Sequence, residues 1–246
     1  MRMRILYIFP RTTPDPAEAV AEHARRRDIL QSAANTGTTV DIKELEGCPP
    51  AIESLRDAYA VAPGIIAMAE SLQDQYDAMI VGCFGDPAVD GAIEGTRIPI
   101  LGCALPAMAT ALLLGDRFAV LSPSESSAAE VHRQVRTAGL LERYAGAVAV
   151  GLGVREFALD PERTMAVAVD AGRRAMDLGA EVLVLGCMSL AFAGVSDTMQ
   201  DRLGIPVINP LRTAVQSAEM LVNARLTPSR RFAGTRAGAE LSAVQH

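Results

Sequence analysis

The segments Tyr76-Asp-Ala-Met-Ile-Val-Gly-Cys83 and Gly179-Ala-Glu-Val-Leu-Val-Leu-Gly-Cys187 share one pattern: an apolar run typical of a buried strand, then glycine, then cysteine. Each is followed by a helix-length stretch and a short apolar run that opens with Ile-Pro, at Ile98-Pro99-Ile100-Leu101 and Ile205-Pro206-Val207-Ile208. The chain therefore contains an internal repeat. A duplicated fold with a thiol at the same place in each half can aim two sulfur atoms at one point. Two opposed thiols suit the removal of a proton from one face of a carbon and its return to the other.

The composition predicts a soluble protein with a sizeable core. The 246 residues are 50% hydrophobic, which is enough for one large domain or two small ones. A net charge of −6 and a pI near 5.2 predict no nucleic-acid partner and no membrane partner. The basic clusters are the run Arg25-Arg26-Arg27 and the arginine-containing tail after Leu226. We interpret them as a solvated helix face and a loose tail.

The N-terminus has the features of a strand rather than of a secretory signal, since the chain passes from Met1 straight into an apolar strand pattern. The longest uncharged stretch, Val182 to Ser196, is shorter than the ~20 residues that span a bilayer. Four cysteines without a secretory signal are expected to be free thiols in a reducing compartment. We therefore expect a cytoplasmic protein.

Short apolar runs alternate with amphipathic segments along most of the chain. Ser127-x-x-Glu130 has the form of a capping box, and Asp160-Pro161 that of a helix start. Because the strands are continuously apolar, the pattern predicts an α/β fold whose parallel sheet is covered on both faces. The expected strands are 4–9, 38–45, 78–82, 99–102, 118–122, 145–150, 182–186 and 206–209. The expected helices are 16–35, 54–73, 89–94, 107–114, 125–137, 162–178, 193–203 and 212–224.

Eight strands and eight helices fit two architectures, a TIM barrel or two separate α/β halves. The internal repeat favours two halves, but a barrel duplicated from half-barrels has the same pattern, so the pattern leaves both open. Beyond Leu226 the composition changes to Pro, Ser, Arg, Gly and Ala without an apolar period, which predicts a mobile tail over 226–246.

The cysteines of the repeat are the best candidates for chemistry. Cys83 lies in Gly82-Cys83-Phe84-Gly85-Asp86-Pro87, between a predicted strand end and a predicted helix start, where α/β folds bind ligands. We expect the helix N-terminus to lower the pKa of this thiol from about 8.5. Cys187 has the same position, with Met188-Ser189 after it. A single cysteine here is more often a small core residue, but two at equivalent points favour a function.

Residues for other common chemistries are scarce in the sequence. The single lysine, Lys43, lies inside a predicted strand, which argues against a pyridoxal phosphate Schiff base. The three histidines are scattered, and no Cys/His spacing fits a metal site. Gly151-Leu-Gly153 lacks the third glycine of a dinucleotide motif. Cys103 has Pro210 as its counterpart and Cys48 lies in a predicted loop, so we interpret both thiols as incidental. We expect thiol chemistry with no cofactor and no metal.

These segments resemble the hydantoin/allantoin racemase branch of the aspartate/glutamate racemase superfamily. The string from Gly82 to Pro87 with Asp90 beyond it is close to that branch's Cys-Phe-Gly-Asp-Pro-Gly-x-Asp. Gly47-Cys-Pro-Pro-Ala-Ile-Glu53-Ser54, which leads to Pro63-Gly64, is similar to its Gly-Pro-x-Ser-Ile-Glu and later Pro-Gly. Leu185-Gly186-Cys187 and the repeat also match, so the resemblance covers residues 4 to 225.

The resemblance implies two similar α/β domains with four-stranded parallel sheets, related by a pseudo-twofold axis, with the active site in the cleft between them. The expected domains are 1–97 plus 207–225, and 98–206. It implies that Cys83 and Cys187 act as acid and base on opposite faces of the substrate carbon. Homo-oligomers are common in this family, so we expect one here. The residues expected to bind substrate are Phe9, Arg11, Thr12, Phe84, Gly85, Ser122, Met188 and Ser189.

Two departures from the family pattern fall where substrate is held. Phe9-Pro10-Arg11-Thr12 replaces Asn-Pro-Asn-Thr, and Cys187-Met188-Ser189-Leu190 replaces Cys-Ala-Gly-Met. An arginine binds carboxylates and an aromatic ring favours flat groups. We hypothesise that Arg11 selects a bulkier or more anionic substrate than an unsubstituted hydantoin. The alternative is that Arg11 points to solvent or pairs with a nearby acid such as Asp15 or Glu18.

We therefore expect a cofactor-independent racemase or epimerase that acts next to a carbonyl on a hydantoin-like or amino-acid-derived small molecule. Alternatives on the same scaffold are a maleate-type cis–trans isomerase and a decarboxylase. An alternative of another class is a thiol redox sensor, in which Cys83 and Cys187 form a disulfide. A disulfide requires the two Cα atoms within about 7 Å, whereas a racemase requires a substrate-sized gap between the sulfurs.

Overall fold

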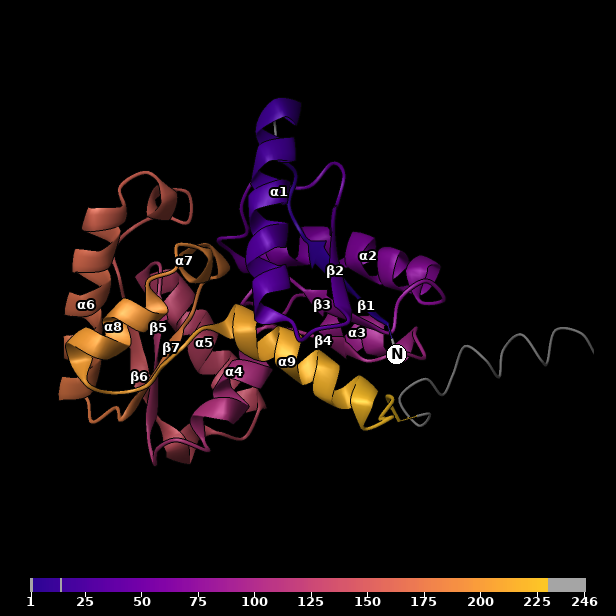
Figure 1. Ribbon diagram of the computed structural model, residues 1–246. Coiled ribbons are helices and arrows are strands. Elements are labelled where there is room, and N and C mark those ends of the chain that lie inside the picture. The colour runs from indigo at the N-terminus through magenta and orange to yellow at the C-terminus, as the bar shows by residue number, and fades with distance from the viewer. Residues whose placement is uncertain (1, 14, 230–246) are drawn as a thin grey trace, which may run out of the picture.

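The chain forms two four-stranded parallel sheets in separate lobes of the computed structural model, which describes residues 2–13 and 15–229 (Figure 1). Their strand orders, β2-β1-β3-β4 and β6-β5-β7-β8, correspond strand for strand. This confirms the duplicated α/β architecture and excludes the barrel, in which all strands would close into one sheet. The strands are β1 (Met3–Phe9), β2 (Thr38–Glu44), β3 (Ala78–Val81), β4 (Ile100–Leu101), β5 (Phe118–Ser122), β6 (Tyr144–Ala149), β7 (Val182–Leu185) and β8 (Val207–Ile208).

Helices follow the strands in both halves. They are α1 (Pro16–Ala33), α2 (Leu55–Leu72), α3 (Val89–Glu94), α4 (Ala104–Ala111), α5 (Glu125–Thr137), α6 (Pro161–Asp177), α7 (Met188–Phe192), α8 (Ser196–Leu203) and α9 (Pro210–Asn223), with 3-10 turns η1 (Leu141–Arg143) and η2 (Glu156–Ala158). Apolar strand residues pack under these helices on both faces of each sheet. Within the described residues, no helix combines the length and apolar character needed to cross a membrane.

The helix starts differ in part from those that the sequence predicts. The predicted start at Asp160-Pro161 is confirmed, since the Asp160 side chain accepts a hydrogen bond from the Arg163 N–H at 2.9 Å. The predicted capping box is wrong. Ser124 rather than Ser127 caps α5, by accepting from the Ser127 N–H at 3.3 Å, and the helix begins at Glu125 as expected. The five-residue helix α7, which begins directly after Cys187, was not predicted.

The strands β4 and β8 do not belong to the domains in which the expected division places them. β4 pairs with β3 of the first sheet, and β8 pairs with β7 of the second. The ranges 98–206 and 207–225 therefore assign each strand to the wrong sheet. Each strand completes the sheet that precedes it, and only then does the chain cross over. The helix α9 then packs on α1 and β3 of the first half, as Figure 1 shows. Most of the expected tail, 230–246, lies outside the described residues.

Candidate active site

The two thiols leave their sheets in the same register. In β1 and β3, Ile8 pairs with Val81, and in β5 and β7, Leu121 pairs with Leu185. Glycine comes next in each half. The N–H of Gly82 donates to the Ile8 carbonyl at 2.8 Å, and the N–H of Gly186 donates to the Leu121 carbonyl at 2.7 Å. The cysteine follows directly, so the same backbone geometry presents Cys83 and Cys187 at the carboxyl ends of the two sheets.

Both cysteines line one cavity of about 370 Å³ between the halves. This volume lies within the range of small-molecule sites. The cavity wall includes Cys83 and Cys187 and six of the residues that the sequence predicts for substrate binding, namely Phe9, Arg11, Phe84, Gly85, Met188 and Ser189. Other wall residues come from α1, from the loop before α2 and the start of α2, from α5, from the turns after β1, β3, β5 and β7, and from Val154.

Two predicted binding residues lie outside the wall of this cavity. The Thr12 hydroxyl donates to the Leu45 carbonyl at 2.7 Å and accepts from the Cys48 N–H at 2.8 Å, so it fixes the loop after β2. Ser122 is fully buried at the end of β5, and its hydroxyl has no hydrogen-bond partner among the described residues. Its neighbour Pro123 reaches the wall instead. The turn after β5 therefore reaches the cavity through Pro123, not through the predicted Ser122.

The turn after Cys83 is fastened to the start of α4 rather than to α3. The Asp86 carboxylate accepts hydrogen bonds from the N–H groups of Cys103 (2.6 Å), Ala104 (3.0 Å) and Leu105 (3.3 Å). A Cβ on Gly102 would overlap this carboxylate. Asp86 itself has a positive φ of 46°, which is a strained conformation for a non-glycine residue. The hydrogen bonds to α4 hold this strained turn in place.

The turn after Cys187 begins a helix at once. Cys187 is the N-cap of α7, and its carbonyl accepts from the Ala191 N–H at 3.0 Å. The backbone N–H groups of Ser189 and Leu190 and the nearby guanidinium of Arg26 all lower the pKa of the Cys187 thiol. Burial has the larger, opposite effect, so the pKa of Cys187 is raised overall.

Burial also decides the pKa of Cys83. It raises this pKa to about 12, with Asp86 adding to the effect and the Gly85 N–H opposing it. The expectation of a lowered pKa is therefore wrong for Cys83, and the pKa of Cys187 is raised as well. Removal of water outweighs the N–H groups, and α3 begins only at Val89, well after Cys83. In addition, the helix α4 directs its N-terminus at Asp86 rather than at a sulfur.

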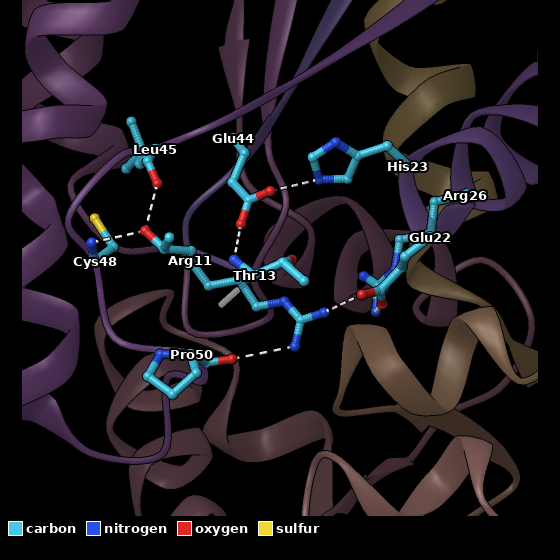
Figure 2. A network of polar contacts seen from close by, with 10 residues as sticks. Arg11, Thr13, Glu22, His23, Arg26, Glu44, Leu45, Cys48 and Pro50 are labelled. Carbon is cyan, nitrogen blue, oxygen red and sulfur yellow. Dashed lines mark hydrogen bonds and ion pairs between the residues drawn. The ribbon is translucent and has the colours of Figure 1, made fainter. Parts of the chain in front are cut away.

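An ion-pair network borders the cavity at the end of β1 (Figure 2). Glu22 lies between two arginines, with Arg11 Nη2 at 2.6 Å and Arg26 Nη2 at 2.7 Å from its carboxylate oxygens. Arg11 Nη1 also donates to the Pro50 carbonyl at 3.1 Å. Arg11 thus pairs with an acid, Glu22, as the alternative reading of the sequence has it. Arg11 still lines the cavity.

Sequence reasoning missed Arg26. It was interpreted as part of a solvated run, yet it is only 4% exposed and belongs to the cavity wall. Its neighbours Arg25 and Arg27 are exposed. The signal that was available is helical spacing: Glu22, Arg26 and Leu30 follow each other at intervals of four, and Leu30 is fully buried.

The other two cysteines lie away from the cavity wall. Cys103 is buried at the start of α4, where its thiol donates to the Val81 carbonyl at 3.4 Å. Cys48 lies in the loop after β2 and is partly exposed. All four cysteines are free thiols. No group of three or more His, Cys, Asp or Glu in the described part of the chain is arranged to hold a metal ion.

A sequence model of the Asp/Glu/hydantoin racemase family matches residues 5–218, nearly the whole described chain. The chain belongs to this family. It is 31% identical over 223 residues to a hydantoin racemase of Paenarthrobacter aurescens, a match that covers 89% of this chain and 91% of that protein. This confirms the resemblance to the hydantoin/allantoin branch and identifies the chain as an isomerase of the racemase type.

Solved structures agree with this assignment. Allantoin racemase from Pseudomonas fluorescens superposes with a TM-score of 0.85 at 26% identity, over 95% of this chain and 97% of that chain. Arylmalonate decarboxylase, at 18% identity and a TM-score of 0.61, covers 89% of this chain and 92% of its own, and shares the fold. The fold therefore occurs with different reactions, and the choice of reaction depends on the residues of the cleft.

Proposed function

We propose that this racemase of the hydantoin/allantoin type works without a cofactor and uses Cys83 and Cys187 as its acid and base. One thiolate removes the proton from the carbon next to a carbonyl of the substrate. The opposite thiol then delivers a proton to the other face, and the two cysteines exchange roles when the reaction runs from the other enantiomer.

The observation that carries the proposal is the shared cleft of the two thiols. Cys83 and Cys187 follow matched strand ends in two corresponding sheets, and both line a cavity large enough for a small cyclic molecule. Two-base chemistry requires groups on opposite faces of one carbon. A cleft between two similar halves suits that requirement, because the two cysteines come from equivalent turns of the two sheets.

The environment of the thiols is consistent with an enclosed reaction. Burial raises the pKa of both, so a thiolate is a strong base once it forms. The N–H groups at the start of α7 and of Gly85, together with Arg26, favour negative charge in the cleft. The backbone N–H groups can also stabilise the anion that develops when the substrate loses its proton.

For the substrate we propose a 5-substituted hydantoin or a related cyclic ureide. The support is the 31% identity to a hydantoin racemase and the likeness to an allantoin racemase structure. The mixture of apolar and polar wall residues suits such a ring: Phe9, Ile52, Phe84 and Val131 offer apolar faces, and Ser189 offers a hydroxyl.

The proposal is tested by incubating single enantiomers of several 5-substituted hydantoins with the enzyme in D₂O. Loss of optical rotation with uptake of one deuteron at C5 supports racemisation. Loss of CO₂ from a malonate, or cis–trans conversion of maleate, without activity on any hydantoin contradicts it and supports one of the other reactions. Activity should withstand EDTA, and iodoacetamide should abolish it unless substrate is present.

A further inference from the structure

Arg26 is held rigidly in the wall of the cleft. Its guanidinium carbon lies 4.5 Å from the centre of the Phe9 ring and 4.4 Å from that of the Phe192 ring. Phe9 ends β1 and Phe192 belongs to α7, and each ring is only 3% exposed. Aromatic faces attract cations most strongly where water is excluded. The two rings therefore fix the guanidinium in the wall that also contains Cys187.

Arg11 and Arg26 share one carboxylate, since both pair with Glu22, so neither guanidinium has an acid to itself (Figure 2). The other acid of the network, Glu44, lies 2.6 Å from His23 and accepts from the Thr13 N–H. Elsewhere in the cavity wall, Glu130 and Arg133 pair with each other. Glu53 is exposed at the rim, where water screens it. A buried charge without a full partner is unfavourable, so the cluster favours the arrival of an anion.

Arg26 retains a donor for such an anion. Its Nη2 is engaged by Glu22, and its Nε is sealed from solvent. Its Nη1 makes no hydrogen bond within the described residues and is not among the sealed atoms. Arg11, in contrast, uses Nη1 for the Pro50 carbonyl and Nη2 for Glu22. The terminal nitrogen that is free to meet a ligand therefore belongs to Arg26.

We propose that Arg26 binds a carboxylate of the substrate, and that the cleft consequently prefers cyclic ureides that carry an acidic side group. Arg11 acts through Glu22 as a positioning residue, since it holds the carboxylate that orients Arg26. The inference relies on the proposed racemase function for its reaction, but binding of the carboxylate can be measured separately from catalysis.

The test uses a matched pair of ligands, 5-carboxymethylhydantoin and its neutral amide, 5-carbamoylmethylhydantoin. The proteins are the wild type, Arg26→Gln, Arg26→Lys and the control Arg27→Gln, which removes an exposed charge from the next position of the same helix. Racemisation gives kcat and KM for both ligands, and titration calorimetry gives Kd. Thermal unfolding shows whether each variant is folded.

The wild type should prefer the acid over the amide by roughly tenfold or more in kcat/KM, because a charge-assisted hydrogen bond discriminates by about that much. In Arg26→Gln the value for the acid should fall by roughly 10- to 100-fold, mainly through KM, while the value for the amide changes by less than about threefold. Arg26→Lys should retain part of the preference, and Arg27→Gln all of it.

Three results would overturn the proposal. One is equal binding of acid and amide by the wild type, which is decisive even if the Gln variant does not fold. Another is an equal loss for both ligands through kcat, since Arg26 would then act on the reacting oxygen rather than on a side group. The third is an unchanged preference in folded Arg26→Gln. If the wild type racemises neither ligand, the panel of 5-substituted hydantoins decides the proposed function separately, and calorimetry still decides whether Arg26 binds the carboxylate.

Discussion

The turns that carry Cys83 and Cys187 have the same backbone position but opposite electrostatic surroundings. Cys83 is partly exposed and is followed by the carboxylate of Asp86, which raises its pKa. Cys187 is 7% exposed, and burial raises its pKa overall, but the N–H groups of α7 and the nearby Arg26 oppose that effect. One side of the cleft is thus more negative and the other more positive.

The difference continues at the junction with the following helix. On the first side, Asp86 receives three N–H groups from the start of α4. On the second side, the neutral Asn209 caps α9 by accepting from the Leu211 N–H at 3.0 Å and donates to the Ala191 carbonyl of α7 at 3.1 Å. A duplicated scaffold therefore keeps the position of each thiol while the residues around it diverge, and position and reactivity can be varied separately.

The largest expected effect is the loss of either thiol. Replacement of Cys83 or Cys187 by Ser should lower racemisation of both enantiomers by roughly 10³-fold or more, because the cycle requires a base and an acid. Each variant should still exchange the α-hydrogen of one enantiomer with D₂O, and the two variants should exchange opposite enantiomers. Chiral chromatography with mass spectrometry measures both quantities.

The controls for this prediction are Cys48→Ser and Cys103→Ser, which lie away from the cavity wall and should remain active. Full racemisation by either the Cys83 or the Cys187 variant contradicts the two-base mechanism. Exchange of the same enantiomer by both variants would show that the two thiols do not face opposite sides of the carbon.

Alanine substitutions of the two glycines before the cysteines should differ in whether a second substitution can compensate for them. A Cβ on Gly82 would overlap the buried ring of Tyr7, whereas one on Gly186 would lie 2.6 Å from Val120 Cγ1 and 2.8 Å from the Leu121 carbonyl oxygen. Either substitution by Ala should destabilise the protein by about 1–3 kcal/mol and lower activity, because each displaces a thiol turn.

A second substitution, at the residue that the new Cβ would overlap, should distinguish the Cys83 turn from the Cys187 turn. Gly82→Ala should cost much less in a Tyr7→Val background than in the wild type, because the overlapping ring is absent, although Tyr7→Val is itself destabilising. Val120→Ala should recover little in Gly186→Ala, because the overlap with a backbone carbonyl remains. Urea unfolding of the single and double variants measures this coupling. Equal rescue on both sides would show that the backbone of β5 moves freely, contrary to this account.

Asp86 predicts a pH dependence that the second side lacks. Burial raises the pKa of Asp86 from 3.8 to about 7. The folded protein then holds this proton more tightly than the unfolded chain, so the contribution of Asp86 to the free energy of unfolding decreases as the pH rises from about 4 to about 7. Asp86→Asn should remove this decrease. Urea unfolding of both proteins at several pH values checks it, and identical pH profiles contradict it.

The strands and the thiol positions could be predicted because their signals are local. The expected strands 78–82 and 182–186 differ from β3 and β7 by one residue at the end, since continuous apolar runs followed by glycine define them. The sheet to which β4 and β8 belong could not be predicted. Both strands have only two residues and the same Ile-Pro start, so only the pairing of distant chain segments distinguishes them.

The cleft was less predictable than the strands because its properties depend on remote contacts. Arg26 is buried by Phe9 and Phe192, which lie far from it in the sequence, and the local run of three arginines resembles a solvated face. The helix α7 is too short for a recognisable period. The thiol pKa values depend on how much water the closed fold excludes, and a strand-end position does not reveal that quantity.

The smallest expected effect concerns the reactivity of the two thiols toward iodoacetamide. Arg26 lowers the pKa of Cys187 but is not among the groups that shift Cys83. Alkylation requires the thiolate, so Arg26→Gln should slow the alkylation of Cys187 by roughly three- to tenfold at a fixed pH and change that of Cys83 by less than about twofold.

Comparing each cysteine with itself in the two proteins cancels the difference in their exposure, and peptide mapping by mass spectrometry separates the two rates. An Arg27→Gln control accounts for the change in net charge. If the alkylation of both thiols slows equally, the guanidinium acts on the cleft as a whole, and the two thiol turns are not electrostatically distinct. If only Cys187 slows, the asymmetry between the two turns is a property of the charges around them, since the backbone register that presents the two sulfurs is the same.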